Sequence, residues 1–160
     1  MDNEAHKIRE KTIVNNRKAR HDYHIIDEIE VGLVLKGSEV KSLRSGKGSL
    51  ADAYARIRQN EVWLIGMNIP VYEKAAIEQE DPTRDRKLLL HRREIKKLIR
   101  RVEEKGVTLV PLRLYFKNNL AKLMLGIARG KRQYDKKVEI AKRDAKRDLD
   151  REQKRFKFKI

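Results

Sequence analysis

Two runs of alternating apolar residues, joined by an Asn-Asn pair, constrain the fold of this chain more than any other feature. The apolar positions of the two runs are Thr108, Val110, Leu112, Leu114 and Phe116, then Ala121, Leu123, Leu125 and Ile127. A period of two is typical of a strand that buries one face, and Asn118-Asn119 suits a tight turn because asparagine tolerates positive φ. The sequence therefore predicts a long β-hairpin, in which Pro111 marks an edge or a bulge because proline donates no ladder hydrogen bond.

Further elements follow from weaker patterns. Alternation from Tyr23 to Leu35 predicts a long antiparallel strand with one solvated face. A short helix is expected at residues 38–44, and two strands at residues 53–58 and 62–67 with a turn between them. Asp81-Pro82 is a helix-start signal, and the amphipathic, basic stretch after it predicts a helix that ends at Gly106.

These elements predict a mainly β fold. The chain has 160 residues, of which 39% are hydrophobic, so it is long enough for one small core. Five or more strands, two or three short-to-medium helices and few spare apolar residues favour a closed, OB-like barrel over a sandwich. No internal repeat and no Gly/Ser linker divides the chain.

The charge indicates a polyanionic partner. Lys and Arg number 40 against 24 Asp and Glu, a formal net charge of +16. Residues 131–160 carry net +7, as much as the 106 residues from 25 to 130. Nucleic acid is the commonest partner of so basic a chain, and an anionic membrane surface is the second choice. The tail has only a thin apolar stripe, which predicts a segment disordered in the free chain that becomes helical against RNA.

Several other classes of protein receive little support. The chain has no cysteine, no run of ~20 apolar residues and no apolar N-terminal signal, so we expect a cytoplasmic protein with no cofactor. Residues 45–49 resemble a phosphate-binding loop but lack two of its required residues. His21 and His24 have no third ligand in a metal-binding pattern.

Two segments carry the residue types of an RNA contact. Residues 15–23 combine Arg17, Lys18 and Arg20 for phosphates with the Asn16 amide for a base edge. Residues 130–137 leave a strand through glycine and place one aromatic ring among cations. The alternative for the first segment is a solvated arm, and for the second a charged extension that serves only solubility.

The chain resembles the small protein B family, the SsrA-binding proteins of bacterial trans-translation. The matching segments occur in family order and cover nearly all of the chain: residues 16–23, 37–44, 81–84, 86–90, 110–112, 114–117 and 126–131. The resemblance implies an adaptor without enzymatic activity. It implies a basic N-terminal arm at residues 1–22, an OB-like barrel at 23–130 that binds the tRNA-like domain of tmRNA, and a tail at 131–160 that becomes helical in the empty mRNA channel of a stalled ribosome.

The resemblance also implies partners and site residues. The partners are tmRNA, the stalled 70S ribosome with its small-subunit rRNA, and elongation factor Tu in the delivery complex, with no membrane and no DNA. The positions that match tmRNA-binding residues are Asn16, Glu30 and Leu89, with Arg17, Lys18 and Arg20 beside the first. The positions that match the decoding centre and mRNA channel are His21, Gly130, Lys131, Arg132, Tyr134, Asp135, Lys136 and Lys137.

One departure and two alternatives accompany this interpretation. Lys137 stands where the family usually has arginine, and lysine keeps the charge but loses the bidentate fork. A structural ribosomal protein with an OB-like core and a basic tail is the main alternative. An RNA-modifying enzyme is a weaker one, because the sequence offers no nucleophile, cofactor loop or metal set.

Overall fold

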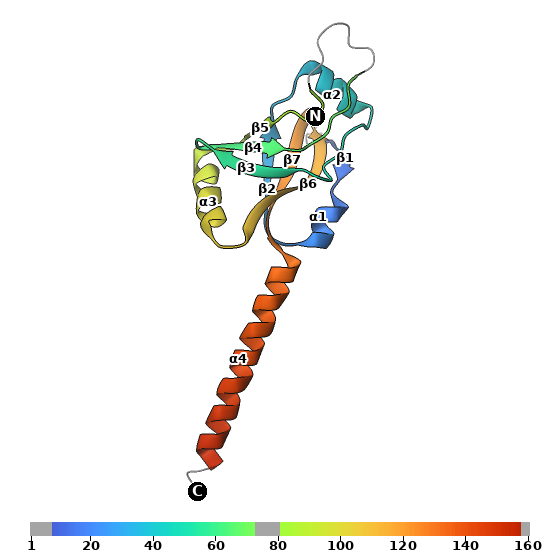
Figure 1. The fold of residues 1–160 in the computed structure, drawn as a ribbon. Coiled ribbons are helices and arrows are strands. Elements are labelled where there is room, and N and C mark those ends of the chain that lie inside the picture. Colours follow the sequence, from blue (N-terminus) through green and yellow to red (C-terminus); the bar gives the residue numbers. More distant parts are fainter. Residues whose placement is uncertain (1–7, 73–80, 158–160) are drawn as a thin grey trace, which may run out of the picture.

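The computed structural model describes residues 8–72 and 81–157, which contain seven strands and four helices (Figure 1). In chain order these are β1 (Glu10–Asn15), α1 (Arg17–Asp22), β2 (Tyr23–Leu33), α2 (Gly37–Arg44), β3 (Tyr54–Arg58), β4 (Glu61–Ile65), β5 (Arg86–Leu89), α3 (Arg92–Glu103), β6 (Val107–Lys117), β7 (Leu120–Gly130) and α4 (Lys131–Lys157). None of the helices in these ranges is long and apolar enough to cross a membrane.

All strand pairs are antiparallel and join in one sheet. The strand order is β1-β6-β3-β4-β5-β2-β7, and β6 also pairs with β7. Six of the strands therefore follow one another in a closed circuit of pairings, with β1 attached outside it on β6. The predicted β-rich fold with inserted helices is confirmed at this level.

Both predicted turns are present. Asn118 and Asn119 have φ of 49° and 67° between β6 and β7, and Gln59 and Asn60 have φ of 50° and 59° between β3 and β4. Two successive residues with positive φ form the turn that matches the twist of a two-residue hairpin. The polar residues between the paired strands therefore determine the conformation of both hairpin turns.

Two β-bulges divide apolar faces that the sequence pattern showed as continuous. The pairing register shifts between Ile25 and Asp27 on β2, and between Pro111 and Arg113 on β6. Each shift inserts one extra residue and so turns the following side chains to the other face. As a result Tyr23, Ile25, Val110 and Leu112 pack in a small cluster with Ala19 of α1, whereas the later residues of both runs enter the main core. Pro111 thus marks a bulge, because its strand is paired with β1, β3 and β7.

The helix predicted to begin at Asp81-Pro82 is wrong in its first part. Residues 86–89 form β5, which pairs with β4 and β2, and α3 begins only at Arg92. Arg86 and Leu88 are buried and their neighbours are not, which is the period of a strand. From Arg92 onward the period is helical, and α3 packs Leu98 into the main core.

Two elements lie in the segment for which the sequence predicted only an arm. β1 pairs with β6, and the main chain of Asn118 donates to the carbonyl of Arg9. α1 packs Ala19 against the bulged part of β6 and against β7. Residues 10–22 therefore belong to the packed body.

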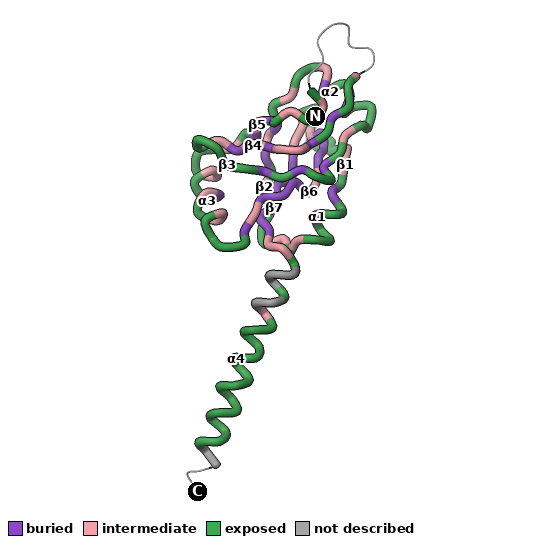
Figure 2. Tube along the Cα trace, in the orientation of Figure 1, coloured by how far each residue is buried: buried purple, intermediate pink, exposed green. Residues whose placement is uncertain are grey.

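Residues 131–157 form α4, a continuous helix, where the sequence predicted disorder in the free chain. It projects from the body, and its described side chains are almost all exposed (Figures 1 and 2). The local sequence accounts for the helix, because the segment contains no glycine or proline and places Glu139 four residues before Arg143 and Asp150 four before Lys154.

Candidate nucleic-acid interface

One row of directly paired residues crosses five strands on the outer side of the sheet. From β5 to β1 the row contains Leu89, Gly32, Lys122, Tyr115 and Thr12. Directly paired residues project to the same side of a sheet, and the chain neighbours of these residues pack in or against the main core. The row therefore faces outward. We name the surface formed by Glu30, Leu89, Tyr115, Lys117 and Lys122 the Glu30 face.

Glu30 is fixed by two residues of β6. The Tyr115 hydroxyl donates to Oε2 of Glu30 at 2.5 Å, and Nζ of Lys117 lies 3.3 Å from both carboxylate oxygens. The hydrogen bond from Tyr115, with those from Lys117, lowers the pKa of Glu30 although partial burial acts against it. The charged carboxylate is therefore held in one place, where its remaining acceptor positions suit amino groups of bases.

Tyr115 is itself buried although it belongs to an outer face. The guanidinium of Arg113 lies 4.1 Å from the centre of its ring, and Arg113 forms an ion pair with Glu10 of β1. Burial, together with the bond to Glu30, raises the pKa of Tyr115. Tyr115 stays protonated and keeps donating to Glu30.

Leu89 lies beside Glu30 because of a glycine. It is 52% exposed, and it pairs with Gly32, two residues after Glu30. A Cβ added to Gly32 would lie 3.1 Å from Cβ of Leu89, so a larger residue there would displace the leucine. The structure therefore joins Glu30 and Leu89, which are 59 residues apart in sequence, on one surface.

Asn16 has a different position from the one that the sequence suggested. It is 5% exposed, and its amide Nδ2 donates to the carbonyls of Pro111 (2.8 Å) and Leu50 (3.2 Å). Its Oδ1 accepts from the main-chain N–H of Ala19, which caps α1. Both amide N–H groups are used inside the protein, so Asn16 has none for a base edge. Its place in the structure is to fix α1 against the bulge of β6.

The cations of α1 are exposed next to this anchor. Arg20 lies 3.4 Å from the carboxylate of Glu28, two residues before Glu30 on β2, and Lys18 lies 3.8 Å from that of Asp52. Both pairs are open to solvent and weak, so phosphates can replace the carboxylates. Arg17 is exposed as well. Of these cations, Arg20 extends the Glu30 face toward the start of β2, whereas Lys18 lies on the side of Asp52, before β3.

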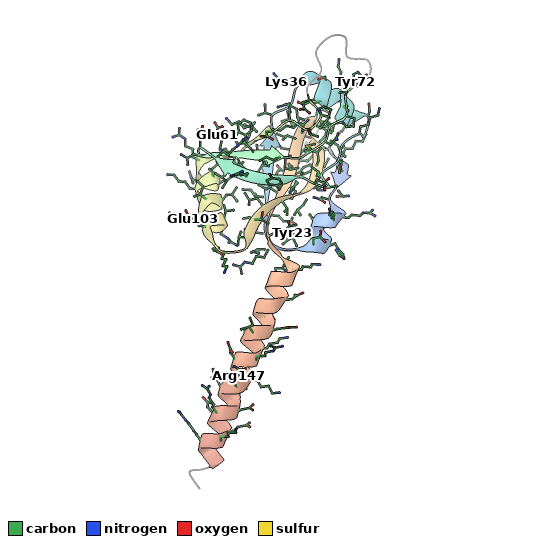
Figure 3. The ribbon with its side chains drawn as sticks, in the orientation of Figure 1. Tyr23, Lys36, Glu61, Tyr72, Glu103 and Arg147 are labelled. Atoms are coloured by element: carbon green, nitrogen blue, oxygen red, sulfur yellow. The ribbon has the colours of Figure 1, made fainter. Side chains whose placement is uncertain are left out.

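Three of the positions that match decoding-centre and mRNA-channel residues of the family lie at the end of the body from which α4 leaves. His21 is exposed, and its Nδ1 lies 3.0 Å from the carboxylate of Asp22. Asp22 directly precedes Tyr23, which pairs with Gly130, the residue before α4 (Figure 3). The hydrogen bond to His21 and the nearby charge of Lys131 contribute to lowering the pKa of Asp22. His21, Gly130 and Lys131 are therefore neighbours in space.

The other tail residues are described only in part. Asp135 is exposed on α4. The side chains of Arg132, Tyr134, Lys136 and Lys137 lie outside the described part of the structure, although their backbone belongs to the first turns of α4.

Sequence analysis missed two sets of residues. The first is Tyr115 and Lys117. They have the parity opposite to the apolar positions of the predicted 108–116 strand, with Lys117 directly after its end, so the pattern contained a signal for them. The second is a buried ion pair in which Arg86 Nε donates to Glu39 at 2.7 Å, with Arg84 bound to the same carboxylate. Burial raises the pKa of Glu39, but the hydrogen bonds from Arg84, Lys36 and Arg86 outweigh it and the pKa is lowered. Glu39 lies in the short helix predicted at residues 38–44, and nothing in that pattern indicated its buried partners.

Comparisons with known proteins agree on one family. A family model described as SmpB protein matches residues 13–155. The chain is 57% identical to the SsrA-binding protein of Acetivibrio thermocellus over 145 residues, which cover 91% of this chain and 94% of that protein. It is 56% identical to the SsrA-binding protein of Thermobifida fusca over 141 residues, 88% of each. A solved structure described as "tmRNA-SmpB: a journey to the center of the bacterial ribosome" contains a similar chain, with 50% identity and a TM-score of 0.63 over 74% of this chain and 83% of that one.

Proposed function

The chain belongs to the SmpB protein family, and on that premise we propose that it is an RNA-binding adaptor for SsrA RNA, or tmRNA. It binds the tRNA-like domain of tmRNA and delivers it to stalled ribosomes for trans-translation. The observation that carries the proposal is the Glu30 face, on which a carboxylate fixed by Tyr115 and Lys117 adjoins an exposed leucine. A fixed acceptor among cations gives direction to a contact that phosphates otherwise dominate.

We propose that the body is an OB-like barrel. The closed circuit of six strand pairings supports this interpretation, as does α3, which packs Leu98 into the main core. An OB fold commonly binds nucleic acid on its outer strand face, and the Glu30 face is such a surface. β1 and α1 precede the proposed barrel at residues 23–130 and are packed additions to it, because both lie against β6.

We propose that α4 enters the empty mRNA channel of the stalled ribosome. Its 27 residues span about 40 Å as a helix, and exposure of its described side chains supports a partner along its length. The closeness of His21, Gly130 and Lys131 at its root supports a contact of all three with the decoding centre. Arg132, Tyr134, Asp135, Lys136 and Lys137 continue this contact along the helix.

The remaining partners follow from the same role. We propose small-subunit rRNA as the surface that α4 meets, elongation factor Tu as a member of the delivery complex, and the cytoplasm as the place where all of them act. As an adaptor the protein needs no catalytic residue.

The decisive experiment is to sequence the RNA that copurifies with the protein at moderate salt. We expect strong enrichment of one tmRNA species over bulk tRNA. Equal recovery of tRNA, with stoichiometric amounts of the protein in washed ribosomes, would instead identify a structural ribosomal protein.

A matched pair of variants tests the Glu30 face. Glu30→Ala and Glu28→Ala remove the same charge from the same strand, two residues apart. Only Glu30 has its carboxylate held by Tyr115, so we expect its loss to weaken tmRNA binding several-fold more than the loss of Glu28. Equal affinities of the two variants in a titration would show that Glu30 is an ordinary surface acid.

Truncation tests the two-part arrangement. A chain that ends at Gly130 keeps every strand and the Glu30 face. We expect it to bind tmRNA with nearly unchanged affinity and to support no tagging on stalled ribosomes. Tagging by the truncated chain would contradict the role proposed for α4.

A further inference from the structure

α3 carries a second cationic surface, which neither the Glu30 face nor α4 includes. Its first nine residues contain five exposed cations: Arg92, Arg93, Lys96, Lys97 and Arg100. At 100° per residue they fall within a 140° arc, opposite the residues that pack on the core, Ile95, Leu98 and Val102. We name these five residues the α3 stripe.

No carboxylate neutralises the charges of the α3 stripe in the part of the chain that the structure describes. In the ranges 8–72 and 81–157, no member of the stripe forms an ion pair, whereas Arg20, Lys117 and Arg113 each have a carboxylate partner. Arg92, Lys96 and Arg100 follow one another at intervals of about 6 Å along the helix. Such a row suits successive phosphates of an RNA backbone and carries no acceptor with which to read bases.

The position of α3 indicates which RNA it meets. The helix runs toward the end of the body from which α4 projects, and Glu103 at its end lies at the left of that end in Figure 3, across the body from the start of α4. Glu104, the next residue, forms an ion pair of 2.9 Å with Arg129, which lies on β7 two residues before the start of α4. An RNA surface that receives α4 therefore passes beside α3.

We propose that the α3 stripe binds the phosphate backbone of small-subunit rRNA beside the entry point of α4. The inference rests on the proposed function, because it takes the ribosome as the partner of α4. It adds a third contact to that function: the Glu30 face selects tmRNA, α4 occupies the channel, and the stripe fixes the body against rRNA. Its contribution is independent of sequence and sensitive to salt.

The test compares two triple variants of the full chain. In the first, Lys96, Lys97 and Arg100 are changed to Gln; in the control, the exposed Lys41, Lys47 and Arg56 are changed to Gln, which removes the same charge elsewhere. Glutamine is a good helix former, so α3 remains stable. Each protein is titrated with isolated small ribosomal subunits and, separately, with the tRNA-like domain of tmRNA at several salt concentrations.

We expect the α3 variant to bind small subunits about tenfold more weakly than the unchanged protein. The slope of log K against log salt concentration should become shallower by about 2. Its affinity for tmRNA should stay within about twofold of that of the unchanged protein. An unchanged affinity for small subunits, an equal loss in the control variant, or a loss confined to tmRNA would each overturn the inference. If the unchanged protein bound neither tmRNA selectively nor small subunits, the proposed function itself would fail.

A second measurement locates the contact directly. The chain has no cysteine, so Lys97→Cys gives a single site for a tethered hydroxyl-radical probe. We expect cleavage of small-subunit rRNA next to the mRNA channel in complexes with stalled ribosomes. Cleavage only in tmRNA, or in no RNA, would contradict the proposal.

Discussion

Replacement of Asn16 by alanine should damage the fold before it affects any RNA contact. The substitution removes the cap of α1 and both hydrogen bonds donated by the amide, to the carbonyls of Pro111 and Leu50. Loss of an N-cap costs about 1 kcal/mol. The carbonyl of Leu50 still accepts from the main-chain N–H of Ala53, so the loss of the two donated bonds adds about 1–2 kcal/mol. The sum is a loss of about 2–3 kcal/mol in the free energy of unfolding.

The loss is large enough to measure by urea and thermal unfolding followed by circular dichroism. For a chain of this length, about 2–3 kcal/mol lowers Tm by roughly 4–12 °C. The matched control is Asn15→Ala, because Asn15 is the same residue type one position earlier and is exposed. We expect the control to change stability by less than about 0.5 kcal/mol.

A second substitution separates the cap from the donated bonds. Asn16→Asp keeps an oxygen that can accept from the N–H of Ala19, but it cannot donate to the two carbonyls. We expect a loss at least as large as that of Asn16→Ala. If Asn16→Asp were as stable as the unchanged protein, or if Asn16→Ala matched Asn15→Ala, the assignment of Asn16 as an internal anchor would be refuted.

Two further predictions follow from the same face of the sheet. Tyr115→Phe removes the largest cause of the lowered pKa of Glu30, so that pKa should rise toward its ordinary value. The stability that Glu30 contributes is present above its unfolded pKa and is lost as pH falls through the lowered folded pKa. Acid unfolding below about pH 4.5 should therefore show a smaller loss of stability in the variant. An unchanged NMR titration of Glu30 would contradict Tyr115 as the cause of the lowered pKa. Gly126→Ala would place a Cβ 2.9 Å from Cδ1 of Leu112, so unfolding should show a loss of about 1–3 kcal/mol; Gly37→Ala, where nothing lies within 4 Å, is the control and should stay close to unchanged.

The hairpins show how far local sequence determines this fold. Alternation gave β6, β7 and most of β2, and the Asn-Asn pair gave a turn with two positive φ values, because strand period and turn conformation depend on near neighbours. The helical state of α4 is local as well. Its hydrogen bonds join residues four apart, so its geometry needs no contact with the body.

The bulges show where local pattern fails. Val110, Leu112 and Leu114 share one parity in the sequence, yet the first two pack beside α1 and the third lies in the main core. An extra residue changes the face of all that follow, and its position depends on the partner strand and on Asn16, which binds the Pro111 carbonyl. Alternation alone does not contain that information.

By itself the sequence determined five of the seven described strands, the turns, the cationic tail and, through its resemblance, the family. Only the tertiary structure decided that Asn16 supports α1 from inside, that Tyr115 and Lys117 fix Glu30, and that Leu89 lies beside it over Gly32. The physical reason is distance along the chain. Strand period and charge are properties of neighbouring residues, whereas each of these contacts joins positions about 60 to 95 residues apart, which meet only when the sheet is paired.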